Sequence, residues 1–410
     1  MRIAIVGAGI AGLAAADALA DADVTLYEAG PRPGGHVYTV DIEGGIAVDM
    51  GFIVHNRERY PHFCALLDEL GIASRPTQMA FSVSAGGIEW GSASLSALFA
   101  DRRSIASRAH WRFLLEVLAF LRNARRDLRL RRVGELSLDE YLHGWSRELR
   151  DRFAIPLAAA LWSLAPDRCG EFPAITYLGF LDHHGMLSPI RPLAWRTIEG
   201  GSRRYVDALL DRLRARPRFA LELATPVSRI ARDVNSVHIM SAGDERRYDR
   251  VVIATHADTA LALLADPSDD ERAALGAFHY SKNRTVLHTD RSFLPGNRAA
   301  HASWNYIADP DTARVAVTYS MTLLQGLPDV PYLVTLNPRR EPTGVLHETW
   351  FEHPQLDRAA LDAQGQLASF GGARRTYYAG AHLGFGFHED GMRSGLAAAA
   401  RLRADERRSR

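Results

Sequence analysis

The chain opens with Arg2-Ile3-Ala4-Ile5-Val6-Gly7-Ala8-Gly9-Ile10-Ala11-Gly12, an apolar run that passes directly into three spaced glycines. The apolar run predicts a buried strand, and the small residues 10–20 predict a helix. Gly7 permits a tight turn, Gly9 lets a pyrophosphate approach the backbone, and Gly12 lets the helix pack closely on the strand. Amide hydrogens at the start of the helix suit phosphate groups. This local pattern predicts a dinucleotide-binding site.

The segments that follow extend this site. A strand expected over residues 24–28 ends in Glu28, about 20 residues after the glycines, where a carboxylate accepts hydrogen bonds from ribose hydroxyls. Arg32-Pro33-Gly34-Gly35-His36 follows at once and offers two further points of close backbone approach. A glycine pair also forms ordinary turns. Placed directly after the ribose acid, the pair favours a longer, extended dinucleotide, FAD, over NAD.

A second motif lies near the C-terminus. Tyr377-Tyr378-Ala379-Gly380-Ala381 predicts a strand that ends at Gly380, and a helix is expected to begin near Glu389. The N-terminus of that helix would point at the pyrimidine edge of a flavin, where the helix dipole stabilises the negative charge of the reduced ring. The two motifs together predict an FAD held by both ends of the polypeptide.

With these motifs, the chain resembles the flavin-containing amine oxidase superfamily, which includes monoamine oxidases, protoporphyrinogen oxidases and carotenoid desaturases. Within it, the chain is most similar to compact bacterial predicted NAD/FAD-binding proteins. That branch includes flavin-dependent desaturases of phospholipid fatty acyl chains, linked to cyclopropane-synthase-like methyltransferases. The matching segments are 49–52, 195–197, 200–202, 304–306, 335–338 and 384–395.

The resemblance implies an α/β fold with two interleaved domains, in agreement with a length of 410 residues. One is a Rossmann-like FAD-binding domain of the glutathione-reductase-like, amine oxidase type, formed by residues 1–72, 193–272 and 371–410. The other is an α+β substrate-binding domain, formed by residues 73–192 and 273–370. Locally, the sequence predicts a helix over about 60–70, a hairpin over 81–90 that turns at 85–87, helices from 94 to about 187, and a buried strand over 251–255.

The cofactor implied by the resemblance is noncovalent FAD, because neither Cys64 nor Cys169 lies near the C-terminal motif, where the family's covalent cysteine usually stands. The residues expected to bind FAD are Gly7, Gly9, Ile10, Ala11, Gly12, Glu28, Arg32, Gly34, Gly35, His36, Met50, Gly51, Phe52, Ile53, Val227, Gly380, His388, Glu389, Asp390 and Met392.

The sequence identifies candidate catalytic residues less specifically than it identifies cofactor-binding residues. Amine oxidases use a lysine near flavin N5, and Lys282 and Arg284 both align near that position. An arginine cannot act as a base, which weakens amine oxidation. Phe387 falls where amine oxidases place a tyrosine of the aromatic cage, although it also suits the core. The candidate catalytic residues are Arg284, His55, Tyr319 and Phe387, with His353 as a further candidate base. The substrate chamber is expected to be lined by His55, Tyr60, Trp162, Arg284, Trp304, Asn305, Tyr319, Asn337, Trp350 and Phe387.

Composition narrows the function classes. A formal net charge of +1 predicts neither nucleic acid nor a polyanionic partner. Two cysteines provide no disulfide framework and fit a reducing cytoplasm. His388, Glu389 and Asp390 are consecutive and would point in different directions, so we expect no metal site. We find neither a signal peptide nor a membrane-spanning run in the sequence.

One segment suggests contact with a membrane. Residues 101–132 contain ten arginines against three acidic residues, interleaved with aromatic and aliphatic side chains at helical spacing. Such a helix would lie on an anionic bilayer with Trp111 and Phe113 inserted. The alternative is a helix that packs on the substrate domain and shows a solvated basic face. The first interpretation places a cytoplasmic protein peripherally on the inner face of the membrane.

The sequence thus predicts an FAD-dependent oxidoreductase that desaturates unsaturated or methylated fatty acyl chains of phospholipids by hydride transfer to flavin N5. Its substrate would be a lipid acyl chain or another apolar small molecule. An amine oxidase or other small-molecule oxidase, and a flavin-dependent double-bond isomerase, stay open as alternatives. A neighbouring fatty acyl methyltransferase is the expected partner.

Overall fold

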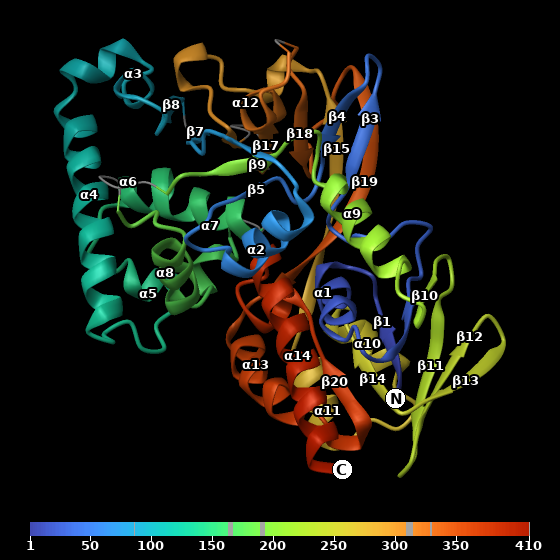
Figure 1. Cartoon of the computed structure of the whole chain (residues 1–410). Coiled ribbons are helices and arrows are strands. Elements are labelled where there is room, and N and C mark those ends of the chain that lie inside the picture. Colours follow the sequence, from blue (N-terminus) through green and yellow to red (C-terminus); the bar gives the residue numbers. More distant parts are fainter. Residues whose placement is uncertain (86, 163–166, 189–192, 309–314, 329, 410) are drawn as a thin grey trace.

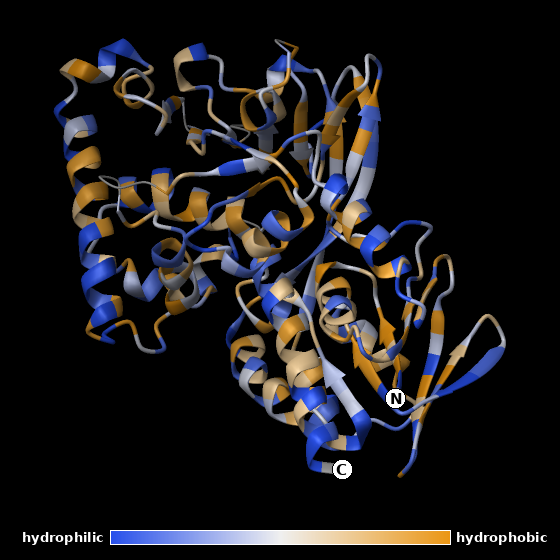
Figure 2. Ribbon diagram, in the orientation of Figure 1, coloured by the Kyte–Doolittle hydropathy of each residue, from blue (hydrophilic) through white to orange (hydrophobic). Residues whose placement is uncertain are grey.

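The computed structural model describes the chain except for residues 86, 163–166, 189–192, 309–314, 329 and 410. A parallel five-stranded sheet brings distant parts of the sequence side by side. Its order is β10 (Phe219–Glu222), β2 (Asp23–Tyr27), β1 (Arg2–Val6), β14 (Arg250–Ile253) and β20 (Thr376–Tyr378). Hydrophobic residues dominate the central strands β1 and β14 (Figure 2), as expected for strands covered on both faces. Both termini lie in this part of the molecule (Figure 1).

One face of this sheet is covered by four helices that share a hydrophobic core. They are α1 (Ile10–Ala18), α2 (Pro61–Leu70), α9 (Arg203–Arg214) and α14 (His388–Ser409). The helices α1 and α14 approach closely because of a glycine. A Cβ atom on Gly395 would lie 2.1 Å from the carbonyl oxygen of Ala11. The C-terminal helix is therefore seated directly on the helix that follows the first glycine motif.

The other face carries a small antiparallel sheet and three helices. The strands are β11 (Val227–Arg232), β12 (Val237–Ser241) and β13 (Asp244–Tyr248), and the helices are α10 (Ala257–Leu263), α11 (Asp269–Gly276) and α13 (Arg358–Phe370).

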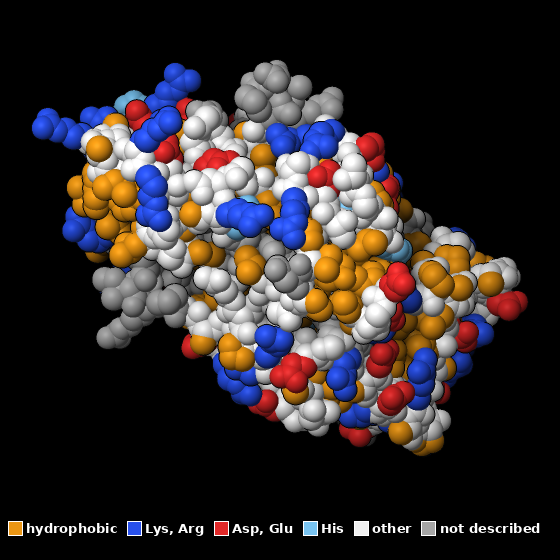
Figure 3. All heavy atoms as spheres, turned by 90° about the horizontal axis from the view of Figure 1, so that it is seen from above, with side chains coloured by type: hydrophobic (Ala, Val, Ile, Leu, Met, Phe, Trp, Pro, Cys, Tyr) orange, Lys and Arg blue, Asp and Glu red, His pale blue; other side chains and the backbone are white. Residues whose placement is uncertain are grey.

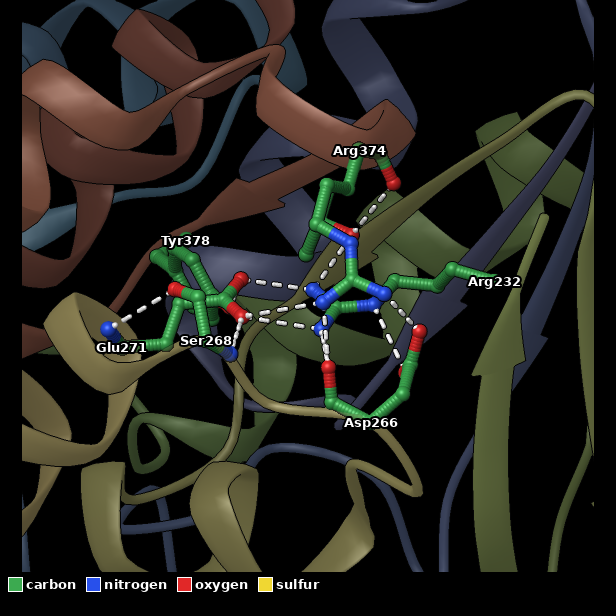
Figure 4. Close-up of polar contacts among 7 residues, drawn as sticks. Arg232, Asp266, Ser268, Glu271, Arg374 and Tyr378 are labelled. Atoms are coloured by element: carbon green, nitrogen blue, oxygen red, sulfur yellow. Dashed lines mark hydrogen bonds and ion pairs between the residues drawn. The ribbon is translucent and has the colours of Figure 1, made fainter. Parts of the chain in front are cut away.

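A buried ionic network joins these elements (Figure 4). The guanidinium of Arg232 on β11 donates to Glu271 Oε1 at 2.6 Å and to Asp266 Oδ1 at 3.1 Å. The hydroxyl of Tyr378 on β20 donates to the same Glu271 oxygen at 2.7 Å. Burial alone would raise the pKa of Glu271, but the hydrogen bonds from Arg232 and Tyr378 hold that pKa at about 2. The network braces the small sheet, α11 and β20 against one another.

A mixed seven-stranded sheet forms the upper part of the molecule (Figure 1). Its order is β19 (Val345–Gln355), β15 (His279–His288), β18 (Leu333–Leu336), β17 (Val315–Ser320), β16 (Trp304–Ala308), β7 (Phe81–Ala85) and β8 (Ile88–Gly91). The hairpin expected around residues 85–87 is present as β7 and β8. The pair β16 and β7 is parallel and joins segments more than 200 residues apart. A short helix, α12 (Met321–Gln325), follows β17.

Helices fill the region between β8 and β9 (Arg196–Ile198), as the sequence predicts. They are α3 (Leu95–Leu98), the 3₁₀ turn η1 (Arg102–Ala106), α4 (Arg108–Arg129), α5 (Leu138–Tyr141), α6 (Arg147–Leu149), α7 (Ile155–Trp162) and α8 (Ala174–His183). Their apolar faces form a second core with β7 and β16. The longest of them, α4, runs along the outer edge of the molecule (Figure 1). None of the helices among the described residues is long and apolar enough to cross a membrane.

Two small sheets link the main ones: the ribbon β3 (Thr39–Ile42) and β4 (Ile46–Asp49), and β5 (Val54–His55), β9 and β6 (Ser74–Pro76). Asp49 ties the ribbon to the start of α9, since its fully buried carboxylate accepts from Thr39 Oγ1 at 2.5 Å and from Ser202 Oγ at 2.7 Å. The architecture confirms the predicted class, a Rossmann-like α/β part combined with an α+β part. The domain boundaries themselves stay a prediction.

Candidate active site

A cavity of about 550 Å³ is lined by residues of both parts of the molecule. At one end lie the two glycine motifs and the strand ends of the five-stranded sheet. At the other end lie aromatic and aliphatic side chains of α7, α8, β16 and β17. In open parallel sheets, ligands bind at the carboxyl ends of the strands, where this cavity begins.

The three glycines of the first motif serve different purposes. Gly7 has a φ of +103°, and a Cβ atom there would lie 2.8 Å from the carbonyl oxygen of Ala254. A Cβ on Gly12 would lie 1.9 Å from the carbonyl oxygen of Gly7, so the fold itself requires both. Gly9, in contrast, has an ordinary φ of −73° and would meet nothing within 4 Å. Because Gly9 lines the cavity, its missing side chain leaves room for a ligand, which fits a bound dinucleotide.

Glu28 lies beside this loop at the end of β2. Its carboxylate accepts from the backbone N–H of Ala8 at 2.9 Å and of Gly30 at 2.8 Å, and it lines the cavity. The second glycine loop is tied to the first, since the Gly34 N–H donates to the Ala8 carbonyl at 2.8 Å. The carboxylate and both loops are therefore pre-positioned for the ribose and pyrophosphate of FAD.

Arg32 does not line the cavity, in contrast to the prediction. Its guanidinium donates to the Val37 carbonyl at 2.8 Å and lies 3.9 Å from the ring centre of Tyr38. Arg32 therefore stabilises the glycine loop, because its guanidinium N–H groups donate to the backbone of that loop.

His36 supports the fit of a polar cofactor. Its ring stacks on Phe351 at 5.1 Å, lies 5.6 Å from His353, and lines the cavity. Its Nε2 atom is buried and makes no hydrogen bond with any described residue. Burial first, and then the neighbouring His353 and His256, lower the pKa of His36 to about 3. A buried polar atom without a protein partner is typical of a site completed by a ligand.

The C-terminal motif divides into lining and supporting residues. Gly380 and His388 line the cavity, with the His388 ring stacked on Phe52 at 3.7 Å. The carboxylate of Glu389 instead accepts the N–H of His62 and of Phe63, each at 3.1 Å, and so caps α2. Glu389 therefore acts on the site through α2.

Asp390 and Met392 also lie outside the cavity lining. Asp390 accepts the N–H of Phe385 at 3.0 Å and of Phe387 at 3.1 Å, which fixes the loop before α14. Burial raises the pKa of Asp390 to about 6. Met392 is buried in the core between α1 and α14. Of the residues expected to bind FAD, five do not line the cavity: Gly12, Arg32, Glu389, Asp390 and Met392. Those that do are Gly7, Gly9, Ile10, Ala11, Glu28, Gly34, Gly35, His36, Met50, Gly51, Phe52, Ile53, Val227, Gly380 and His388.

The far end of the cavity is aromatic and apolar. Phe387 stacks on Phe180 with ring centres 4.5 Å apart, and Tyr319 meets Trp304 edge to face at 5.5 Å. Burial raises the pKa of Tyr319 well above its ordinary value of 10, so its hydroxyl stays protonated. The side chains at this end are Tyr60, Met79, Leu161, Trp162, Phe180, His184, Met186, Trp195, Trp304, Tyr319, Leu336 and Phe387.

Two predicted catalytic residues lie elsewhere. Arg284 does not line the cavity, and its guanidinium forms ion pairs with Glu341 at 2.6 Å and Glu348 at 2.7 Å. His55 packs edge to face on Phe63 in the interior, 5.4 Å away. The reason is the alternation of side chains along a strand: Val54 lines the cavity, so His55 points to the other face. Burial, then Arg196 and Arg57, lower the pKa of His55 to about 4.

Three further residues expected in the chamber, Asn305, Asn337 and Trp350, also lie outside the cavity lining. The expected residues that do line the cavity are Tyr60, Trp162, Trp304, Tyr319 and Phe387. Asn305 accepts the hydroxyl of Ser82 at 2.8 Å, and Asn337 accepts the N–H of Arg284 at 3.0 Å, both away from the cavity. Trp350 is about half exposed, and the Lys282 ammonium lies 5.7 Å from its ring centre. Lys282 is itself exposed and does not line the cavity, so the lysine of the amine oxidase pattern has no counterpart among the described lining residues.

Sequence reasoning missed His184, which lies among the aromatic side chains. Its ring centre is 3.8 Å from Phe180, 5.2 Å from Phe387 and 6.1 Å from Trp195. Its Nδ1 lies 3.1 Å from the Phe180 carbonyl oxygen, which only accepts, so Nδ1 carries the hydrogen and Nε2 keeps the lone pair. Burial lowers the pKa of His184 to about 3, which keeps the ring neutral. The local sequence around His183 and His184 does not indicate that the second histidine lines a cavity.

The chain is similar in sequence to one protein family and in fold to several solved structures. The model of the flavin-containing amine oxidoreductase family matches residues 10–403. A CLA-producing fatty acid isomerase from P. acnes superposes with a TM-score of 0.72 at 19% identity, covering 98% of both chains. A putrescine oxidase variant gives 0.71 at 15% identity, and cyclohexylamine oxidase from Brevibacterium oxydans IH-35A gives 0.68 at 18% identity, each covering 99% of both chains. These structures share the fold of this chain.

The glycine cradle, the ribose acid and the C-terminal motif meet in one cavity, and the family match spans nearly the whole chain. The chain therefore belongs to the flavin-containing amine oxidoreductase family and is an FAD-dependent oxidoreductase.

Proposed function

We propose that the protein desaturates fatty acyl chains of phospholipids. The observation that carries this proposal is the composition of the aromatic end of the cavity, where the described lining residues include neither a carboxylate nor a lysine. The two carboxylates that line the cavity elsewhere are Glu28, held by the glycine loop, and Glu352, which pairs with His256 at 3.3 Å. An ammonium substrate would be desolvated there without a counter-charge, whereas an acyl chain is suited to such walls.

The side chains suggest a division of roles. FAD, which the two glycine loops and Glu28 would hold, would supply the acceptor for a hydride from a substrate carbon. The walls formed by Phe180, Phe387 and Trp304 bind the chain and exclude water. The proton leaves the carbon beside the one that gives up the hydride. Positive charge that develops there makes this C–H acidic enough for the Nε2 lone pair of His184 to accept the proton, although burial lowers the pKa of the ring. Tyr319, with a protonated hydroxyl, provides a wall and a donor.

A double-bond isomerase is the second candidate. The same apolar chamber with one imidazole base supports it, and a fatty acid isomerase is among the proteins that share the fold. In that reaction the double bond moves within the chain, and the substrate loses no hydrogen overall.

Anaerobic mixing of the purified holoprotein with its substrates tests the proposal. Phospholipid vesicles rich in unsaturated chains are expected to bleach the flavin absorbance, while a panel of primary amines leaves it unchanged. Bleaching by amines alone would overturn the proposal in favour of an amine oxidase.

The variant Lys282→Met provides a second test against amine oxidation. Since Lys282 is exposed and outside the cavity lining, flavin reduction and reoxidation should stay within about twofold of the parent rates, a change of less than about 0.5 kcal/mol in barrier. Stopped-flow absorbance measures both rates. A tenfold slower reoxidation would place this lysine at the flavin and count for the oxidase.

A further inference from the structure

The outer face of α4 exposes apolar side chains in a row. Trp111 is 47% exposed, Leu115 is 64% exposed and Leu118 is 52% exposed. Spacings of four and three residues place them on one side of the helix. Ile105, in the preceding turn η1, is 50% exposed and accepts the Trp111 indole N–H through its carbonyl at 2.9 Å. Large apolar side chains gathered in this way mark interaction surfaces.

Basic side chains surround this row. Arg108, Arg112 and Arg122 are exposed on the same side of α4, and none of them forms an ion pair within the described part of the chain. The two acidic residues of the helix are engaged elsewhere, because Glu116 accepts from the backbone N–H of Ser146 at 2.8 Å and Asp127 accepts from Tyr141. Figure 3 shows hydrophobic side chains interspersed with basic ones at this edge of the molecule. The face is thus apolar in its centre and cationic around it.

The opposite face of α4 anchors the helix. Phe113 is 2% exposed and Phe120 is fully buried, and Phe113 meets Trp90 at 5.6 Å. The expectation that Phe113 enters a membrane is therefore wrong, because its side chain belongs to the core. Since α4 is held along its length, the outer row is presented on a rigid support.

A surface groove borders the row. It is lined by Arg112, Leu115, Glu116, Gly144, Trp145 and Ser146. Its walls combine the guanidinium of Arg112 with the side chains of Leu115 and Trp145, which suit an acyl chain, while the carboxylate of Glu116 accepts from Ser146.

We propose that the α4 docking face, formed by Ile105, Arg108, Trp111, Arg112, Leu115, Leu118 and Arg122, binds the surface of an anionic phospholipid bilayer. The apolar row would enter the interface, and the arginines would contact lipid phosphates. The face also lies near the chamber, because α4 packs on α8, whose Phe180 lines the cavity. This position deepens the proposed function, since the acyl substrate would come from the bound bilayer. Vesicle binding is measured without turnover, so the test of the α4 docking face does not depend on the proposed desaturase activity.

Flotation of the holoprotein with vesicles tests the proposal. The protein is expected to float with vesicles of 70% phosphatidylcholine and 30% phosphatidylglycerol, and far less with phosphatidylcholine alone. Each arginine near the surface is expected to contribute about fivefold in affinity. The variant Arg108→Gln/Arg112→Gln/Arg122→Gln should therefore bind about a hundredfold more weakly. Raising the salt to 1 M should weaken binding of the parent protein, because the charges are screened.

Matched controls distinguish binding by this face from a general effect of positive charge on the protein surface. Arg218, Arg229 and Arg247 are also exposed and form no ion pair within the described residues, but Arg218 directly precedes β10, and Arg229 and Arg247 belong to the small sheet. Their triple glutamine variant should bind vesicles like the parent. A second variant, Trp111→Ser/Leu115→Ser/Leu118→Ser, keeps the charges and should also lose binding, with Val234→Ser (88% exposed) as its control.

Two results would overturn the proposal. One is a parent protein that does not float with anionic vesicles, or that floats equally well after either triple change on α4. The other is a dimer, measured by light scattering, that those changes convert to a monomer while vesicle binding is absent. The face would then be an interface between copies of the chain.

Discussion

At the scale of single residues, a substitution at Gly9 should affect FAD binding much more than it affects folding. The variant Gly9→Ala should change the free energy of unfolding of the apoprotein by less than about 1 kcal/mol, because the φ is ordinary and the space is open. The added methyl group should lower FAD affinity by tenfold or more, because it fills the backbone approach to the pyrophosphate. Fluorescence titration with FAD measures the affinity.

Gly365→Ala is the matched control for that substitution. It also adds a methyl group in open space, but within α13 and away from the cavity lining. Its FAD affinity should equal that of the parent. Equal affinities in both variants would contradict the placement of FAD at Gly9.

A substitution of His184 tests whether this residue is the base. Replacement of His184 by Phe preserves the aromatic packing and removes the Nε2 lone pair. The rate of flavin reduction by lipid should fall by about 10²-fold or more, while FAD stays bound. His183→Phe is the control, because His183 is adjacent but does not line the cavity. A parent-like rate in His184→Phe would move the base to another residue.

The residue scale also shows what sequence can predict. The glycines and Glu28 were predicted because their spacing is local and the backbone alone enforces it. The positions of Arg284 and His55 were not, since a strand changes face at every residue and its register depends on distant partners. His55 and Arg284 illustrate this dependence, because both belong to strands paired with remote segments.

At the scale of elements, α14 organises the site from one end. Its Glu389 accepts two N–H groups at the start of α2 and pairs with His62 Nδ1 at 2.7 Å. Replacement of Glu389 by Ala should lower the free energy of unfolding by about 1–2 kcal/mol, the usual cost of a lost helix cap. Chemical denaturation measures this change. Glu389→Gln retains an acceptor and should lose less, and equal losses in the two variants would contradict the capping role.

Elements with local signals were predicted well. The helices around residues 10–20 and 60–70, the hairpin β7–β8 and the strand β14 all appear close to the expected positions. The ribbon β3–β4 and the parallel pair β16–β7 were not expected, because their pairing depends on tertiary contacts and not on periodicity. Local patterns therefore predict strands in this part of the chain, but not the order of the strands in the seven-stranded sheet.

At the scale of the whole molecule, buried histidines make stability depend on pH. His55, His184 and His382 are at most 5% exposed, and burial is the main cause that lowers their pKa to about 4, 3 and 3. The unfolded chain binds protons near pH 6.5 and the folded chain does not, so stability is full above pH 6.5 and falls as the pH drops toward 4.

The variant His382→Gln should flatten this dependence. Each such histidine contributes a slope of up to about 1.4 kcal/mol per pH unit within the window. Thermal unfolding of the holoprotein with saturating FAD, measured between pH 7.5 and 4.5, should show a smaller decline for the variant. An identical decline in both proteins would contradict the neutral, buried state of His382.

With FAD bound, an acyl chain in the aromatic end of the cavity should be oxidised. The most direct test of this claim is a single anaerobic turnover of holoprotein with a phospholipid of defined unsaturated chains, followed by mass analysis of the lipid. Bleached flavin and a lipid lighter by two hydrogens, in equal amounts, are the expected result. A changed lipid of unchanged mass with the flavin still oxidised would contradict it and identify an isomerase.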